Sequence, residues 1–205
     1  MSRVSAGSGA GSRRLAARLF GIPLRWLGLS AGAATLAVSG FFGGLEGPDE
    51  PAIPVVQPGT VDRGSPWNVT VSRVRLVNDL GTLRLTVPGD RWLAVVATVE
   101  VTADESRNDL DDVLRLTGVL GLMSQEPAHV MLMRDATELG RLNPGMPEEI
   151  AFVWEQSAGA APPGTVTVQI YGKTYRMDNL ANRMEWLDPA VRAEVVAPVQ
   201  DRRAG

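Results

Sequence analysis

The segment RWLAVVATVEVT, residues 91–102, carries the strongest structural signal in this chain of 205 residues. It contains four valines and a tryptophan, and β-branched and aromatic residues favour strands. The turn-forming run Pro88-Gly89-Asp90 precedes it. The segment therefore predicts a strand in the centre of a sheet.

Shorter strand patterns lie on both sides of this segment. Trp67, Val69 and Val71 alternate with polar residues, which is the period of a half-buried strand. Pro-Gly turns separate several of the later patterns, and a less regular stretch, residues 177–189, suggests one helical turn. Strands are predicted for residues 67–77, 83–87, 91–102, 113–122, 129–133, 149–155, 165–171 and 191–199.

About eight short strands without a long helical pattern favour a mainly β fold. We predict a single antiparallel immunoglobulin-like β-sandwich, with a barrel or a mixed fold as alternatives. The chain has no cysteine, so the Cys…Trp…Cys pattern of antibody domains is missing. The sequence therefore excludes an antibody-type domain and favours the looser class of immunoglobulin-like sandwiches.

Residues 26–45, WLGLSAGAATLAVSGFFGGL, contain no charged residue. A helix of this length would reach roughly 30 Å, the thickness of a bilayer core. Five arginines and no acid precede it, which predicts a cytoplasmic N-terminus and an extracytoplasmic C-terminal domain. The alternative is a cleaved secretory signal ending near Ala37-Val38-Ser39.

Two glycine pairs lie within this apolar segment. Gly28 with Gly32, and Gly40 with Gly44, each form a GxxxG motif, which lets a second helix approach closely. Glycine is also common in membrane helices generally, so the pairs are candidates for helix packing only.

The sequence thus divides into five parts: a cytoplasmic basic segment at 1–25, a transmembrane helix at 26–45, a Pro-rich extracytoplasmic linker at 46–66, a β-sandwich domain at 67–199 and a tail at 200–205. Everything after residue 45 holds 15 basic and 23 acidic residues, a net charge of −8. A domain with this negative charge is a poor partner for nucleic acid, because phosphates bind to basic surfaces.

The residues that carry chemistry are sparse. His129 is the single histidine and stands at the start of a predicted strand, where a structural or surface role is expected. Residues 104–112, DESRNDLDD, gather five acids that either form a solvated loop or supply oxygens to calcium. Residues 28–32, GLSAG, match a serine-hydrolase pattern but lie within the predicted membrane helix, and the serines of the predicted domain lack a nucleophile motif. We therefore expect no catalytic set, no cofactor and no enzyme activity.

The tryptophans of the domain divide into two groups. Trp92 and Trp154 lie within strong strand patterns and are expected in the core. Trp67 and Trp186 lie near element ends and are candidates for exposed surface contacts with a protein or a sugar.

The order of these segments resembles the immunoglobulin-like domains of Gram-positive, notably actinobacterial, membrane-anchored surface proteins. In those domains a long strand follows a Gly-Asp turn, and a later Pro-Gly pair introduces a strand with a buried aromatic residue. The matching positions are Gly89, Asp90, Trp92, Pro144, Gly145, Phe152 and Trp154. The resemblance covers roughly residues 60–175 and implies an extracytoplasmic interaction domain.

These observations predict a single-pass protein of the cell membrane that displays an interaction domain outside. An accessory subunit of a membrane complex, for example of the transporter type, is one concrete form, and its partner would be another membrane protein. The alternative is an exported module that binds cell-wall carbohydrate or calcium.

Overall fold

The computed structural model describes residues 52–203. The predicted cytoplasmic segment and the predicted transmembrane helix lie outside these residues, together with Gly28, Gly32, Gly40 and Gly44. Within residues 52–203, no helix is long and apolar enough to cross a membrane.

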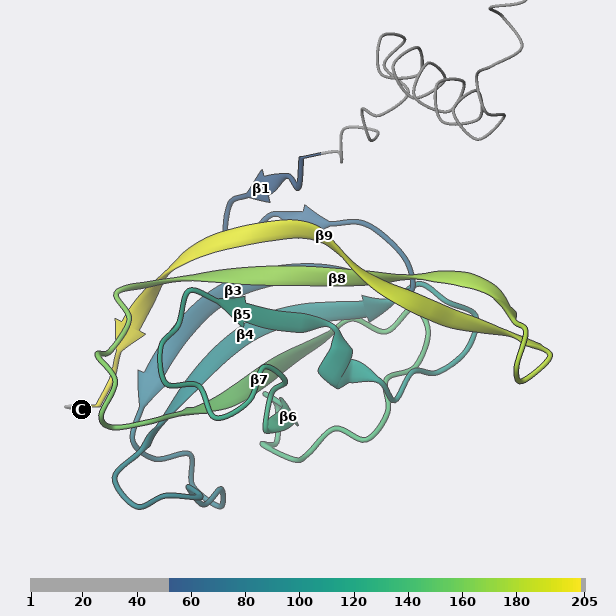
Figure 1. Cartoon of the computed structure of the whole chain (residues 1–205). Helices are drawn as coiled ribbons and strands as arrows, with labels where there is room; N and C mark the ends of the chain where they lie inside the picture. The colour runs from purple at the N-terminus through teal and green to yellow at the C-terminus, as the bar shows by residue number, and fades with distance from the viewer. Residues whose placement is uncertain (1–51, 204–205) are drawn as a thin grey trace, which may run out of the picture. The chain divides into compact units, whose positions relative to one another are not determined.

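The described chain forms two layers of β-strands, which Figure 1 shows one above the other. One layer has the order β3-β4-β7-β6 and is antiparallel throughout. The other has the order β5-β8-β9, also antiparallel. The bounds are β3 Trp67–Val77, β4 Arg91–Val101, β5 Leu114–Thr117, β6 His129–Leu132, β7 Glu148–Gln156, β8 Thr165–Asp178 and β9 Arg183–Asp201. A short 3-10 helix, η2 Leu110–Asp112, precedes β5.

Strand β9 connects the two layers along one side. Its middle pairs with β8, whereas Val199 to Asp201 at its end run parallel to Val74 to Leu76 of β3. The prediction of a mainly β, sandwich-like domain is therefore confirmed.

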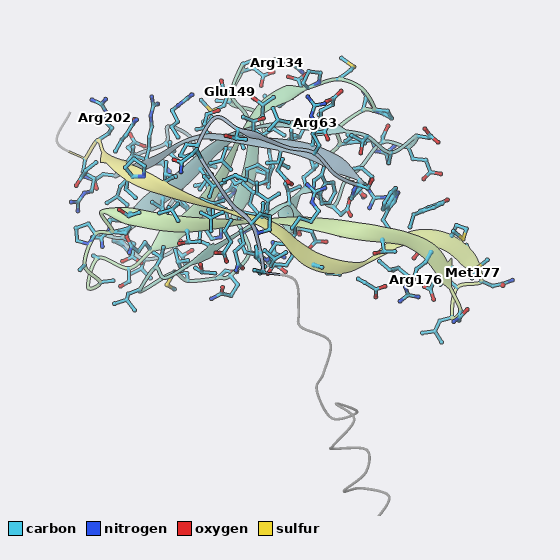
Figure 2. All side chains as sticks on the ribbon, turned by 90° about the horizontal axis from the view of Figure 1, so that it is seen from above. Arg63, Arg134, Glu149, Arg176, Met177 and Arg202 are labelled. Atoms are coloured by element: carbon cyan, nitrogen blue, oxygen red, sulfur yellow. The ribbon has the colours of Figure 1, made fainter. Side chains whose placement is uncertain are left out.

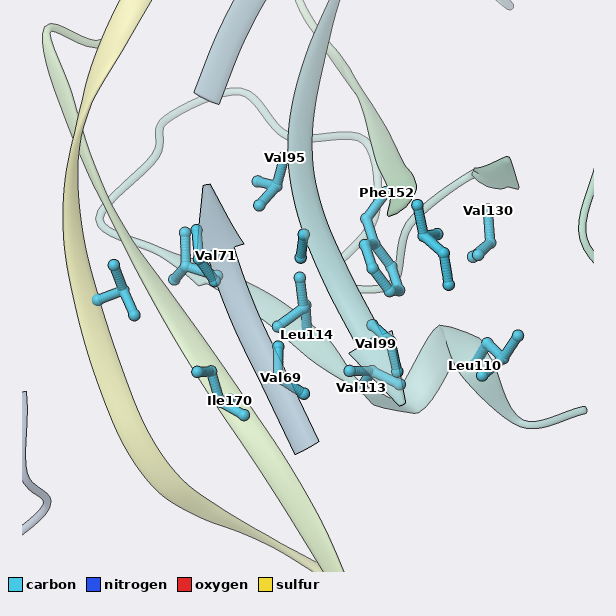
Figure 3. Close-up of a cluster of buried hydrophobic side chains, with 14 of the residues drawn as sticks. Val69, Val71, Val95, Val99, Leu110, Val113, Leu114, Val130, Phe152 and Ile170 are labelled. Carbon is cyan, nitrogen blue, oxygen red and sulfur yellow. The ribbon is translucent and has the colours of Figure 1, made fainter. Parts of the chain in front are cut away.

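The core lies between the layers, where inward-facing side chains alternate along each strand. Val69 and Val71 of β3 meet Leu114 and Ile170 from the opposite layer, and all are buried (Figure 3). Each fully buried Val, Leu, Ile or Phe side chain contributes about 1.5–3 kcal/mol through removal from water. Trp154 is also buried in this core, as its strand pattern predicted.

Strand β4 is buried on both faces, which confirms it as the central strand. Leu93 and Val95 point into the main core, whereas Trp92 and Ala94 belong to a second cluster on the outer face of the sheet. Residues buried on both faces explain why this segment reads as a nearly continuous apolar run.

The structure corrects three details of the predicted elements. The strand predicted at residues 113–122 is shorter, because β5 ends at Thr117 and residues 118–121 include a bend and a turn. Residues 83–87 form an irregular loop with a bend at residues 86 and 87, and their alternation arises because Leu83 and Leu85 pack on the second cluster from this loop. Residues 177–189 contain no helical turn; most of them extend β8 and β9 into a hairpin.

The part of the predicted linker that the structure describes pairs with the sandwich. Strand β1, Val55–Val56, runs parallel to β9, and strand β2, Val61–Asp62, runs antiparallel to β3. Arg192 of β9 also forms an ion pair with Asp62. Residues 55–62 thus lie along the domain, since short extended runs can add hydrogen bonds at a strand edge.

Candidate functional site

The outer halves of β8 and β9 form a two-stranded hairpin, residues 174–187, which we call the arm. β5 pairs with β8 only up to Ile170, and β1 pairs with β9 only at Glu194 and Val195. Within the arm the two strands therefore pair only with each other in the described structure. Figure 1 shows this hairpin extending past the other strands, at the end of the domain opposite the C-terminus.

One face of the arm is apolar. Tyr175 is directly opposite Trp186, and Met177 is directly opposite Met184. Because side chains alternate along a strand, these four residues share one face. The Tyr175 and Trp186 rings lie with their centroids 5.1 Å apart, yet Tyr175 remains 50% exposed.

The tip of the arm continues this exposure. Leu180 in the turn is 99% exposed, and both methionines are exposed as well. Figure 2 shows Met177 near the tip, at the opposite end of the domain from Arg202. Several large apolar side chains gathered on one projecting element are unusual for a free surface and make the arm a candidate interaction site.

The other face of the arm is charged and internally paired. Arg176 forms an ion pair with Asp188, and Arg183 forms one with Glu185. The hydrogen bond from Arg176 lowers the pKa of the Asp188 carboxyl below its usual range. The arm is thus an amphipathic ribbon with its charges neutralised on one side.

A groove of about 490 Å³, the arm groove, separates the apolar face from the acidic loop. Tyr175, Met184 and Trp186 line one side, and Glu105, Asn108 and Asp109 line the other. A smaller cavity of about 220 Å³ continues past Asp104 and again touches Tyr175 and Trp186. Arg107, Arg183 and Glu185 complete the lining, so the site offers aromatic and methionine side chains beside carboxylate, amide and guanidinium groups.

Lys173 fixes the root of the arm. Its Nζ lies 2.5 Å from a carboxylate oxygen of Asp109 and 2.6 Å from one of Asp112, and its side chain is only 8% exposed. The ammonium also lies 5.8 Å from the centroid of the Trp67 ring, within the range of a cation–π contact. The loop at 109–112 is thereby bonded to the base of the hairpin.

Trp67 has a structural role at this root, which corrects its assignment as a surface contact. The residue is fully buried, and its Nε1 donates a hydrogen bond of 2.7 Å to the Tyr171 carbonyl. The physical reason is that the first residue of β3 already faces the core, where its ring contacts Tyr171 and Lys173 at the root of the arm. Trp186, by contrast, lines the arm groove and stays a candidate for a surface contact.

The electrostatics of Asp109 follow from this arrangement. Burial by itself would raise the pKa of the carboxyl. Hydrogen bonds from Arg107 and Lys173 outweigh that effect, so the pKa lies below its ordinary value of 3.8. Asp109 is thus held as a carboxylate by two cations.

This pairing bears on the calcium alternative for residues 104–112. Asp109 and Asp112 already bind the Lys173 ammonium, and Arg115 donates to Asp112 at 3.0 Å. Within residues 52–203, no group of three or more His, Asp or Glu side chains is arranged to hold a metal ion. Two of the five acids whose spacing suggested calcium, Asp109 and Asp112, are therefore paired with cationic side chains.

His129 begins β6, as expected, and is partly exposed. Its ring lies 5.7 Å from that of Trp92, and its Nδ1 lies 3.5 Å from Glu138. The residues that sequence reasoning missed are Tyr175, Met177, Leu180 and Met184. Their signal was present as alternation on either side of Asp178 to Asn182, but two shifts in the β8–β9 register obscured it.

Comparison with known proteins adds little to this description. No protein-family model matches the sequence, and no curated protein matches it. Among solved structures, an uncharacterized β-sandwich protein of Clostridium difficile resembles the chain with a TM-score of 0.41 at 7% identity. The match covers 74% of this chain and 99% of that one. It carries no argument about function.

Proposed function

We propose that the chain is a single-pass, membrane-anchored interaction protein whose extracytoplasmic sandwich docks to another membrane protein through the arm. An accessory subunit of a transporter-type complex is its most concrete form. The observation that carries this proposal is the apolar face of the arm, Tyr175, Met177, Met184 and Trp186, with Leu180 at the tip.

The chemistry of this face supports docking to a protein. Aromatic residues and methionine are enriched at interfaces because they bury large areas and adapt to irregular surfaces. The root contacts of Lys173 and Trp67 hold the hairpin before a partner arrives, so less conformational entropy is lost on binding. The arm can therefore act as a preformed binding element.

The location rests on the sequence. The uncharged residues 26–45 with their arginine flank support a membrane anchor, and the glycine pairs offer a second contact within the bilayer. The acidic character of the remainder argues against nucleic acid and an anionic lipid surface as partners. The proposed role is binding, without catalysis.

We further propose that the sandwich is immunoglobulin-like. The orders β3-β4-β7-β6 and β5-β8-β9 correspond to the A-B-E-D and C-F-G sheets of constant-type immunoglobulin domains. In this correspondence the arm is an elongated F–G hairpin. The F–G loop carries contacts in antibody variable domains, which suits a docking role here.

Affinity capture of the full chain from membranes in mild detergent tests the proposal. The wild type should recover a membrane protein in stoichiometric amount. Met177→Asp should reduce that recovery at least about tenfold, because a charge on a buried contact removes a central anchor. Leu120→Asp is the matched control, since Leu120 is 74% exposed but lies outside the arm. Recovery of the wild type alone, or equal recovery with Met177→Asp, would refute the docking role.

A second candidate, cell-wall carbohydrate, is favoured by one observation. The aromatic pair Tyr175 and Trp186 borders the polar arm groove, and sugars combine an apolar face with hydroxyl groups. Sedimentation of the full chain with isolated cell-wall polysaccharide separates the candidates. For a sugar site, Trp186→Ala abolishes sedimentation and Met177→Asp leaves it intact, because Met177 lies outside the groove lining.

A further inference from the structure

The outer face of the sheet β3-β4-β7-β6 contains an apolar hollow, distinct from the arm. It has a volume of about 370 Å³, within the range of small-molecule sites. Three alanines create it, because Ala94, Ala136 and Ala151 leave space where larger side chains would fill the surface. Met131, Met133 and Val153 are among the other residues that line it.

The hollow is built into the fold on several sides. Ala94 and Val96 of β4 pair with Val153 and Ala151 of β7, which forms a floor buried from solvent. Leu80 and Gly81 from the loop before β4 border it on one side, and residues after β6 border it on another. The floor residues thus gain burial from the surrounding loops, without being covered by a second layer of strands.

Arg75 is the one charged residue among those that line this hollow, and no acid lines it. Arg75 pairs with Ala94 across β3 and β4, so its side chain stands at the edge of the floor. Its Nε is buried and has no hydrogen-bond partner among the described residues. Arg73, two residues earlier on the same face, also has a buried Nε without a partner, but its Nη1 donates to Glu149 at 2.9 Å, and no acid lies among the residues that line the hollow beside Arg75.

A buried, unsatisfied donor on a cation is unfavourable, and an anion is its natural complement. The neighbouring wall is apolar, so the complementary ligand has a negative head and an apolar tail. A nucleotide or a sugar would leave its polar groups unpaired against the alanine and methionine side chains.

We propose that this hollow binds a single acyl chain with an anionic head group, the tail lying on Ala94, Ala151 and Val153 and the head bonded to Arg75. This site is independent of the arm, and its ligand is a small amphiphile. The head can be the carboxylate of a free fatty acid or the phosphate of a single-chain membrane lipid, which share the required chemistry.

Photolabelling of the full chain in membranes tests the site. The probes are photoactivatable analogues of dodecanoate, of dodecanol and of a single-chain phosphatidylglycerol, with adducts located by peptide mass spectrometry. We expect adducts on residues 131–136 and 151–153 from one or both anionic probes, and far fewer from the alcohol. Labelling by dodecanoate alone assigns a free fatty acid, and labelling by the phospholipid alone assigns a membrane lipid.

Charge variants separate head recognition from simple partition. Arg75→Gln should lower labelling by the anionic probe roughly tenfold, because a charge-assisted hydrogen bond is lost, and Arg75→Lys should restore part of it. Arg63→Gln, which removes an exposed arginine elsewhere, is the matched control. Ala151→Leu should block labelling by filling the hollow.

Two results would overturn the proposal. One is labelling of the hollow that is equal for the alcohol and unaffected by Arg75→Gln. The other is the absence of adducts at residues 131–136 and 151–153 with both anionic probes. The control for folding is the thermal unfolding temperature of Arg75→Gln. If it equals that of the wild type, a loss of labelling reflects the site and not the fold.

Discussion

At the scale of single residues, Lys173 links the candidate site to the rest of the domain. It is the single lysine of the chain, and it lies between two carboxylates and the face of Trp67. Its three donors can satisfy Asp109 and Asp112 together, which holds the acidic loop against the root of the arm. Loss of this residue should therefore affect both stability and the geometry of the arm groove.

We expect Lys173→Met to lower the free energy of unfolding by about 1–3 kcal/mol, since it leaves two partly buried carboxylates without their cation. Chemical denaturation of the full chain measures this change. Arg63→Met, which removes an exposed cation, should stay within about 0.5 kcal/mol of the wild type. Equal changes in the free energy of unfolding for the two substitutions would contradict a stabilising role of the Lys173 contact.

Asp109 gives this contact a defined pH dependence. Its pKa in the folded state lies below the ordinary value of 3.8, so the folded state favours the carboxylate. The stabilisation is present in full above that value and is lost as the pH falls through the lower folded pKa. Unfolding free energies measured from neutral pH down to strongly acidic pH should therefore decline less steeply for Asp109→Asn than for the wild type. Parallel curves would contradict the assignment.

At the scale of the elements, the arm depends on a close approach at its base. A Cβ at Gly172 would lie 2.5 Å from Cδ of Arg192 and 2.9 Å from the backbone oxygen of Ser65. Lys173 N–H also donates to that oxygen at 3.0 Å, so the two segments cannot separate without losing a hydrogen bond. The glycine lies between two register shifts that reorient the hairpin.

Gly172→Ala should consequently destabilise the domain by about 1–3 kcal/mol through overpacking. Thermal unfolding of the full chain is the measurement. Gly164→Ala is the control, because a Cβ there meets nothing within 4 Å. A Gly172→Ala protein as stable as the Gly164→Ala protein would mean that the base of the arm tolerates a wider spacing.

The elements also show which parts of the fold were readable from sequence. β4 was predictable because burial on both faces demands an apolar run, and β3 because half-burial demands alternation. The extension of β8 and β9 was not, because two shifts in the β8–β9 register interrupt the alternation where the arm begins. Likewise, residues 83–87 alternate because a loop covers Trp92, and sequence alone does not distinguish that from a strand.

The candidate site was only partly predictable for a related reason. Trp186 and the acidic loop were identified by residue type, yet their proximity depends on long-range packing through Lys173. Trp67 was assigned to the surface because its position at a strand end suggested exposure, whereas tertiary packing buried it. Sequence reasoning thus identified Trp186 and the acidic loop, but it missed the other apolar residues of the arm and the geometry of the site.

At the scale of the whole molecule, the proposed anchor and the proposed docking arm are complementary roles. Residues 26–45 would limit the protein to one membrane, which raises its effective concentration near a membrane partner. A modest interface on the arm would then suffice for stable association. Helix packing through the glycine pairs of residues 26–45 stays a prediction, and it would add a second contact with the same partner.

The central claim, that the arm is the docking surface, is tested most directly by site-specific crosslinking in intact membranes. A photoactivatable amino acid replaces Leu180 at the tip in one protein and Leu120, an exposed leucine outside the arm, in another. We expect a discrete crosslinked species of higher mass from position 180 and none from position 120. No crosslink at position 180, or the same crosslink at both positions, would contradict the claim.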